Sequence, residues 1–353
     1  MTIDVVKVFL PAILAFFIGI GITPILSHYF FKYKLWKKSS RSTNNIDVIS
    51  EDFKKIHNEE GELGTPRVGG MLIWLSALLT ISALFILFVL FPNSITGKLE
   101  FVSRNQTLIP IVAFILAALI GLVDDLLQVS GRGVYARDGE VFRWIKIGTL
   151  IVIGLFVSFW FYFKLDMHSI HIPFGGELNL GILFIPFFIL VMLAVFSSSV
   201  IDGIDGLSGG VLAPIFLAYA GIAFSNNQID LAAFSAVIAG ATLAFLWFNI
   251  PPARFYMGET GMLSLTVVLA VIAFMTNSVL ILPIVAMPLV LTSLSVILQM
   301  LSRKFRNNKR IFKIAPLHHH FEAIGWPKYK VTMRFWVLSI VFALVGMVLY
   351  LIS

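Results

Sequence analysis

Four polar motifs and a run of histidines are the features of this chain whose residue types and spacing could do chemistry. They are residues 64–70 (Gly-Thr-Pro-Arg-Val-Gly-Gly), Asp124-Asp125, Asp202-Gly203-Ile204-Asp205-Gly206, Glu259 between two nearby glycines, and His318-His319-His320-Phe321-Glu322. Carboxylate oxygens are ligands that a hard divalent cation such as Mg²⁺ prefers. With imidazoles and cationic side chains beside them, they suit the charge neutralisation that phosphoryl transfer requires.

Each motif alone also has a plainer interpretation. An Asp pair at the end of a helix can be a solvated terminus, and Glu259 can simply favour the dipole at the start of a helix. Residues 64–70 are ordinary loop sequence, and the histidines can belong to a solvated loop. Asp-Gly-x-Asp-Gly is more specific, because its glycines permit tight turns while two carboxylates are presented three residues apart.

Long apolar segments lie between these motifs and must position them. Of the 353 residues, 58% are hydrophobic and 13% charged, and the mean hydropathy is +0.93, which excludes an ordinary soluble protein. Because about twenty apolar residues cross a bilayer as a helix, the sequence predicts an all-α polytopic membrane protein with a single domain, 1–353. We expect about ten transmembrane helices: 5–27, 68–91, 107–123, 145–163, 181–197, 208–225, 230–250, 259–275, 279–301 and 334–352.

Lys and Arg residues assign the two sides of the membrane. If successive loops alternate, the loops 28–67, 124–146, 198–207, 251–258 and 302–334 carry 22 of the 26 basic residues. By the positive-inside rule this side is cytoplasmic, and both termini lie on the outer face. The net charge of +7 is then mainly a topology signal, and nucleic acid is not an expected partner because the basic residues are juxtamembrane. The absence of cysteine excludes thiol nucleophiles and disulfides.

All of the polar motifs fall on the side assigned to the cytoplasm, although that assignment used Lys and Arg alone. Acidic residues in or beside a membrane span are costly and usually functional. The sequence therefore predicts an active site at the cytoplasmic face, where a water-soluble phosphate donor meets a lipid-borne acceptor beside carboxylate-bound Mg²⁺. A secondary transporter is the alternative from another class, but it predicts acids near the middle of the bilayer and repeat symmetry.

The motifs, in their order, resemble those of the polyprenyl-phosphate N-acetylhexosamine-1-phosphate transferase superfamily. The resemblance rests on Gly-Thr-Pro-x-x-Gly-Gly, Val-Asp-Asp, Asp-Gly-x-Asp-Gly-Leu, Phe-x-Met-Gly-acid-x-Gly and Ala-Pro-x-His-His-His-Phe-Glu, and it covers essentially the whole chain. The triple histidine, with residues 294–299 and 310–322, makes the chain most similar to the phospho-N-acetylmuramoyl-pentapeptide transferase family.

This resemblance implies a step of peptidoglycan biosynthesis in the bacterial cytoplasmic membrane. UDP-MurNAc-pentapeptide and undecaprenyl phosphate would give lipid I and UMP, with Mg²⁺ as the cofactor. A multi-pass protein in the lipid bilayer is implied, with a homodimer as one assembly.

Roles for individual residues follow from the resemblance, position by position. It implies catalytic roles for Asp124, Asp125, Asp202, Asp205, His318, His319 and His320. It implies metal ligation by Glu259 and Asp205. It implies substrate contacts from Thr65, Arg132, Lys146, Asn249, Tyr256 and Glu322, with Tyr256 stacking on the uracil base. For the Asp pair we favour an orienting, electrostatic role over proton removal, because a phosphate monoester is already largely dianionic near neutral pH.

The chain departs from the family pattern at several positions. Gln128 replaces a Lys, Ser199 and Phe196 replace Asn residues, Glu259 replaces an Asp, and Met262 replaces a Ser. These departures keep open a divergent paralogue that has lost its activity. A sister enzyme that transfers GlcNAc-1-phosphate or a related sugar phosphate is a further alternative. Residues 65–70 favour it slightly, and the histidine run disfavours it.

Overall fold

The computed structural model describes residues 2–36, 64–103, 105–131 and 139–353. Its helices are α1 (Thr2–Lys32), α4 (Met71–Leu90), α5 (Ser94–Leu99), α6 (Leu108–Ser130), α7 (Gly139–Lys164), η3 (Gly181–Leu183), α8 (Phe184–Ser197), η4 (Ser198–Ile201), α9 (Leu207–Ser225), α10 (Ile229–Asn249), α11 (Gly258–Met275), α12 (Leu282–Val285), α13 (Met287–Phe305), α14 (Leu317–Ala323) and α15 (Lys328–Ile352). The two strands are β1 (Ser169–Ile172) and β2 (Gly176–Asn179). The prediction of an all-α polytopic protein is confirmed, apart from one short hairpin.

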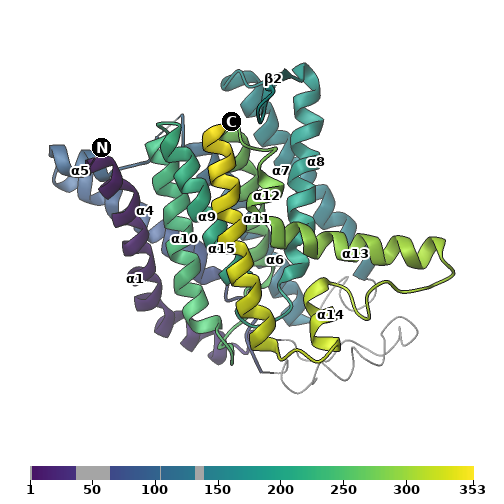
Figure 1. The fold of residues 1–353 in the computed structure, drawn as a ribbon. Coiled ribbons are helices and arrows are strands. Elements are labelled where there is room, and N and C mark those ends of the chain that lie inside the picture. The colour runs from purple at the N-terminus through teal and green to yellow at the C-terminus, as the bar shows by residue number, and fades with distance from the viewer. Residues whose placement is uncertain (1, 37–63, 104, 132–138) are drawn as a thin grey trace.

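Most of the long helices run side by side in one bundle (Figure 1). Within the described ranges, nine helices are long and apolar enough to cross a membrane, and they match nine of the ten predicted segments. Helix α11 lies at the centre of the bundle. In its apolar membrane-length stretch 94% of the residues are buried, against 22% in the corresponding stretches of α1 and α15. The central helix is therefore shielded by its neighbours, while α1 and α15 present most of their apolar surface outward.

The tenth predicted segment, 279–301, is wrong as a single transmembrane helix. The chain breaks at Ala286 between α12 and α13, and a proline lies at the start of each helix, Pro283 and Pro288. Proline has no backbone N–H to donate and its ring clashes with the carbonyl one turn earlier, so Pro288 favours a break at this place, although α1 continues through Pro11 and Pro24. In Figure 1, α13 lies across the direction of the other helices.

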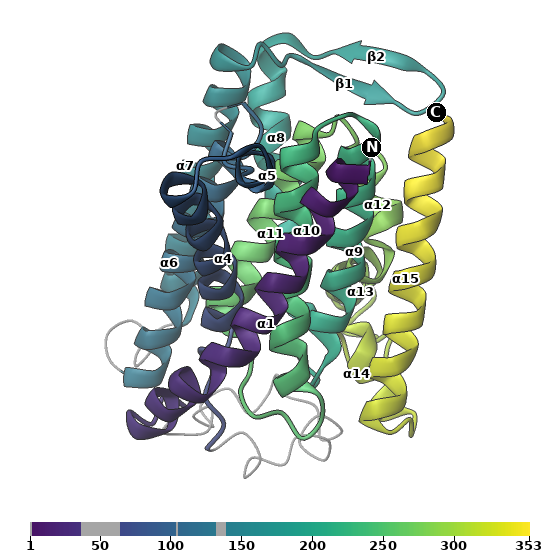
Figure 2. The same cartoon turned by 90° about the vertical axis from the view of Figure 1, so that its left-hand side faces the viewer.

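Helices α12 and α13, together with the segment 306–316 that leads to α14, nevertheless return the chain from one end of the bundle to the other. The two termini consequently lie at the same end, and α14 lies toward the opposite end (Figure 2). We call these the termini end and the site end. The two views show both termini at the same end of the bundle, and the assignment of that end to the outer face stays a prediction.

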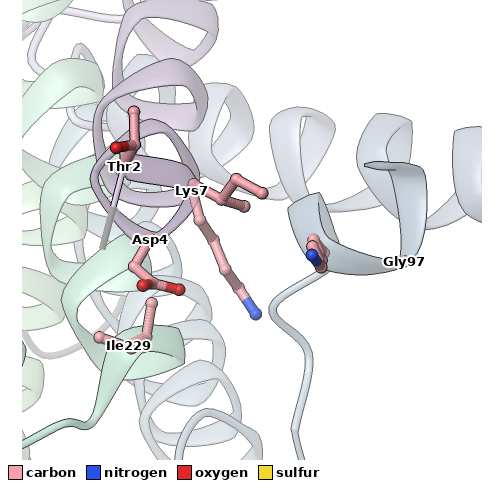
Figure 3. Close-up of a pocket in the computed structure, with 7 residues that line it drawn as sticks. Thr2, Asp4, Lys7, Gly97 and Ile229 are labelled. Atoms are coloured by element: carbon pink, nitrogen blue, oxygen red, sulfur yellow. The ribbon is translucent and has the colours of Figure 1, made fainter. Parts of the chain in front are cut away.

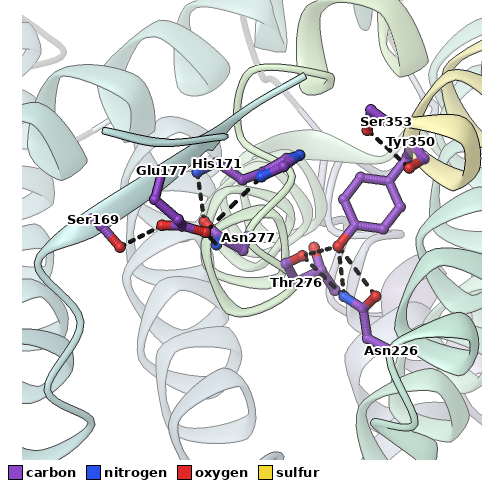
Figure 4. Close-up of polar contacts among 8 residues, drawn as sticks. All are labelled: Ser169, His171, Glu177, Asn226, Thr276, Asn277, Tyr350 and Ser353. Atoms are coloured by element: carbon purple, nitrogen blue, oxygen red, sulfur yellow. Dashed lines mark hydrogen bonds and ion pairs between the residues drawn. The ribbon is translucent and has the colours of Figure 1, made fainter. Parts of the chain in front are cut away.

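A β-hairpin is attached to the termini end (Figure 4). Strand β1 pairs antiparallel with β2, with Ser169 opposite Asn179. Asn277, which follows α11, fixes the hairpin from below: its Oδ1 accepts the His171 backbone N–H at 3.0 Å, and its Nδ2 donates to Glu177 Oε1 at 2.9 Å. Side-chain hydrogen bonds of this kind satisfy backbone groups that no strand partner serves.

Candidate active site

Lys146 joins two carboxylates from different helices at the site end. Its Nζ lies 2.8 Å from Asp124 Oδ2 and 2.8 Å from Glu259 Oε1. Asp124 comes from the last turns of α6, Glu259 from the first turn of α11, and Lys146 from α7. Gln128, one turn after Asp124, donates from Nε2 to the same Asp124 Oδ2 at 3.2 Å. Residues far apart in the sequence therefore form one charged cluster with two acids and one ammonium group.

The second carboxylate of the pair, Asp125, has a different position. It is buried, and its two oxygens accept the backbone N–H groups of Glu259 at 3.0 Å and Thr260 at 2.9 Å. These N–H groups belong to the first turn of α11, where no intrahelical acceptor exists. The Thr260 hydroxyl donates to the Ala118 carbonyl of α6 at 2.9 Å. Asp125 thus ties α11 to α6 and fixes the backbone that carries Glu259.

Gly258 permits this close contact. Its φ is +67°, a conformation that side-chain-bearing residues rarely adopt, and a Cβ there would meet the Arg67 carbonyl oxygen and Asp125 Oδ2. The backbone of residues 66–70 runs alongside, since the Gly69 and Gly70 N–H groups donate to the carbonyls of Tyr256 and Met257, both at 2.8 Å. The glycine-rich motifs therefore serve as the contact between the two loops.

The Asp202 carboxylate is half-buried next to this cluster. Its Oδ1 accepts the Ser208 hydroxyl at 2.8 Å. Burial raises the pKa of Asp202 to about 6, against the lowering effects of the Ser208 hydrogen bond and the Arg67 charge. Ser208 and Arg67 were not singled out from the sequence. Arg67 could have been, because it is the one cation inside the motif 64–70.

Asp205 and Asn249 lie together on the other side of the same turn. Asp205 Oδ2 accepts the Ala253 backbone N–H at 3.0 Å. Asn249 is buried, accepts the Gly206 N–H at 2.9 Å and donates to the Phe255 carbonyl at 2.9 Å. Among the described residues no hydrogen bond or ion pair joins Asp205 to the Glu259 cluster. Asn249 therefore holds the turn and the loop before α11 in place.

The three histidines occupy unequal positions. His318 and His319 are buried, and a Cβ on Gly203 would lie 2.6 and 2.8 Å from their Nε2 atoms, so both rings pack against the Asp202 turn. His319 Nδ1 lies 2.6 Å from Glu322 Oε2. His320 is half-buried, and burial together with the Lys313 charge lowers its pKa. His320 is thus the member of the run with an accessible ring.

Three predicted substrate contacts remain. Tyr256 is half-buried beside the cluster, and its backbone N–H donates to the Pro66 carbonyl at 2.8 Å. Thr65 is half-buried in the adjoining loop. Arg132 lies outside the described residues.

The oxygen donors near Lys146 suit a magnesium ion. No group of three His, Asp or Glu side chains in the described ranges forms a metal cage made of protein alone. However, Asp124 Oδ1 and Glu259 Oε2 are buried without a hydrogen-bond partner there. Mg²⁺ usually binds one or two carboxylates, keeps several waters and takes its remaining ligands from substrate phosphates. Asp124 and Glu259 fit that pattern better than Asp205, whose Oδ2 accepts a backbone N–H.

A cavity at the opposite end of the bundle contains none of these residues (Figure 3). It has a volume of about 580 Å³ and lies between the starts of α1 and α10 and the end of α5. Beside it, Lys7 Nζ and Asp230 Oδ1 form an ion pair at 2.5 Å. Its position separates it from the candidate active site.

Comparison with known proteins places the chain among the glycosyl transferases. Residues 107–277 match the family described as Glycosyl transferase family 4. Over the whole chain, the similarity is more specific. The phospho-N-acetylmuramoyl-pentapeptide-transferase of Geobacillus sp. (strain WCH70) is 34% identical over 95% of this chain and 96% of its own length. The proteins of that name from Chloroflexus aggregans and Bacillus subtilis (strain 168) are each 32% identical, over 99% and 95% of this chain and 91% and 95% of their own lengths.

The chain belongs to the phospho-N-acetylmuramoyl-pentapeptide transferase family. Its membrane-length helices and its bacterial relatives identify it as a multi-pass protein of the bacterial cytoplasmic membrane. The membrane-length helices and the similarity thus agree on a membrane-bound transferase.

Proposed function

We propose that this chain transfers phospho-MurNAc-pentapeptide from UDP-MurNAc-pentapeptide to undecaprenyl phosphate, which gives lipid I and UMP. An oxygen of the lipid phosphate forms a bond to the phosphorus that carries the sugar, and the bond from that phosphorus to the bridging oxygen of UMP breaks. The observation that carries the proposal is Lys146 held between Asp124 and Glu259, in a chain similar over its full length to transferases of this name.

The charged side chains suit two phosphate-bearing substrates. Lys146 and Arg67 supply positive charge where the diphosphate and the lipid phosphate meet, and Asp124 orients the Lys146 ammonium group. Fixed charges that neutralise phosphate oxygens are the main contribution a protein makes to phosphoryl transfer. Asp125 is already used by the α11 backbone, so it positions Glu259 and does not touch the substrate.

We also propose that Mg²⁺ is held by Glu259 and Asp124 together with phosphate oxygens of the donor. A bound Mg²⁺ would polarise those oxygens and neutralise charge that develops on the leaving UMP. The partnerless oxygens of the two carboxylates support this assignment. In this arrangement the protein contributes the ligands and the surrounding charges.

The site end would face the cytoplasm. The chain segment 302–334, which contains nine Lys and Arg residues, includes α14 at that end. By the positive-inside rule, such a segment stays on the cytoplasmic side. The termini end, with the hairpin, would then lie on the outer side, as the sequence predicts. A homodimer also stays a prediction.

The test is UMP release by the purified protein in detergent, with UDP-MurNAc-pentapeptide, undecaprenyl phosphate and Mg²⁺. We expect Mg²⁺-dependent release by the wild type and at least about a 100-fold loss in Asp124→Asn. Asp230→Asn, the same change at the termini end, should retain release. Release with UDP-GlcNAc in place of UDP-MurNAc-pentapeptide would identify the sister transferase. No release by folded wild-type protein would overturn the proposal.

A further inference from the structure

A row of polar side chains on α13 binds the backbone of the segment that follows this helix. Ser295, Gln299 and Ser302 are spaced four and three residues apart, so they lie on one face, and all three are buried. Ser302 Oγ donates to the Lys309 carbonyl at 2.8 Å, and Ser295 Oγ accepts the Leu317 N–H at 2.9 Å. The later residue of α13, Ser302, therefore bonds the start of the segment 309–317, and the earlier residue, Ser295, bonds its end. The segment runs antiparallel to the helix.

Gln299 forms the centre of this row. Its Oε1 accepts the N–H groups of Ile311 and Phe312, both at 3.0 Å, and its Nε2 donates to the Phe312 carbonyl at 3.0 Å. The amide oxygen and the amide nitrogen of Gln299 thus both bond to two consecutive residues. A buried glutamine is costly unless its polar atoms are paired, and here the pairing fixes the backbone of a loop.

The segment fixed by Gln299 contacts the accessible histidine directly. The Lys313 N–H donates to His320 Nδ1 at 3.2 Å, and the Phe312 ring packs edge-to-face with the His320 ring, with centroids 5.5 Å apart. Because Nδ1 accepts this bond, a neutral His320 carries its proton on Nε2. Gln299 therefore binds the backbone of Phe312, whose ring packs on His320 and whose neighbour Lys313 donates to His320 Nδ1.

We infer that Gln299 is a positioning residue that holds the segment 309–317 and so orients His320 toward the sugar-nucleotide donor. The inference rests on the proposed function for the identity of that donor. It explains the polar face of α13, whose residues Ser295, Gln299 and Ser302 are not part of the charged cluster around Lys146. Small displacements of a positioning group lower turnover even when the chemistry lies elsewhere.

Gln299→Leu is the first test, because leucine fills similar space without hydrogen bonds. We expect the KM for UDP-MurNAc-pentapeptide to rise about 10- to 100-fold, while the KM for undecaprenyl phosphate stays within about twofold. Amide hydrogen exchange across residues 309–317 should speed up in the same variant. Gln299→Glu keeps the acceptor oxygen and loses the donor, so both effects should be intermediate.

Ser302→Ala is the matched control, since it removes one hydrogen bond from the same face at a position that does not reach His320. It should leave both KM values within about twofold of wild type. Equal effects from Ser302→Ala and Gln299→Leu, or unchanged exchange in Gln299→Leu, would overturn the inference. If the wild type releases no UMP, the proposed function fails, and the exchange comparison alone decides whether Gln299 holds the segment.

Discussion

Asp125 and Glu259, 134 residues apart in the chain, are joined because the Asp125 carboxylate accepts the Glu259 backbone N–H at 3.0 Å. The neighbouring Asp124 instead contacts the side chain of Lys146. The two adjacent aspartates therefore have different roles: Asp125 fixes the start of α11, and Asp124 orients the Lys146 ammonium group. The sequence treats them as an equivalent pair.

The pair should respond differently to the same substitution. Asp125→Asn replaces one acceptor oxygen with an amide that faces a backbone N–H, which should cost about 1.5–3 kcal/mol of unfolding free energy. In Asp124→Asn, Lys146 stays paired with Glu259, so thermal unfolding should change less while UMP release falls. Thermal unfolding in detergent and UMP release measure the two effects. A larger stability loss in Asp124→Asn would contradict this division.

The acid side of the pH–activity profile should depend on Asp202. Its pKa in the folded protein is raised to about 6 from 3.8, so below pH 6 it loses the charge that faces Arg67, and activity should fall. Through this group the folded state binds the proton more tightly than the unfolded chain, so acidification from pH 6 toward 4 favours folding. The activity loss should therefore occur without unfolding.

Ser208→Ala tests that assignment. Loss of the hydroxyl that donates to Asp202 Oδ1 should raise the pKa further, so the acid limb of UMP release should move to higher pH. Ser235→Ala, which removes a buried hydroxyl that bonds only to the Leu231 carbonyl, should leave the limb in place. If the acid limb of the activity profile stays near pH 6 in Ser208→Ala, the fall in activity does not depend on the protonation of Asp202.

Glu259 should control the response to magnesium. Glu259→Gln removes the negative charge, and we expect UMP release to fall about 100-fold. Glu259→Asp retains the charge on a side chain one methylene shorter, so the Mg²⁺ concentration for half-maximal release should shift, because Mg²⁺ requires near-ideal octahedral geometry. Glu177→Gln in the hairpin is the control. Unchanged Mg²⁺ titrations in both Glu259 variants would remove this residue from the metal site.

Gly258→Ala should destabilise the protein more than Gly131→Ala. Both glycines have positive φ, +67° and +60°, and that backbone conformation alone costs an alanine about 1–2 kcal/mol. At Gly131 an added Cβ meets nothing within 4 Å, whereas at Gly258 it meets the Arg67 carbonyl and Asp125. Thermal unfolding of the two variants isolates the steric part. Equal losses of thermal stability in the two variants would show that the loops around Gly258 move apart to accommodate the added Cβ.

The membrane helices were predictable from the sequence, since a run of about twenty apolar residues is a local signal. The break inside 279–301 was less evident, because the segment is apolar enough to be counted as a span. Pro283 and Pro288 mark the break. The purpose of the polar positions that follow, such as Gln299, becomes visible only when the segment 309–317 lies against them.

The candidate site was only partly predictable for a similar reason. Motif spacing identifies Asp202 and the histidine run as polar groups near one membrane face, and the family resemblance adds Asn249. Motif spacing does not distinguish a side chain that contacts a substrate from one that hydrogen-bonds to backbone groups of the protein. Asn249 bonds two backbone groups, and His318 packs against Gly203, because the tight turn at Asp202 needs support from neighbouring chain segments.

The shared end of the two termini has a practical consequence for labelling. Because the two termini lie at the same end of the bundle, an affinity tag or a fluorescent protein fused at either terminus lies at the end opposite α14 (Figure 2). Two such fusions would report the same compartment. A reporter that works on only one side of the membrane would therefore read the same signal from both, and the opposite signal from an insertion beside α14.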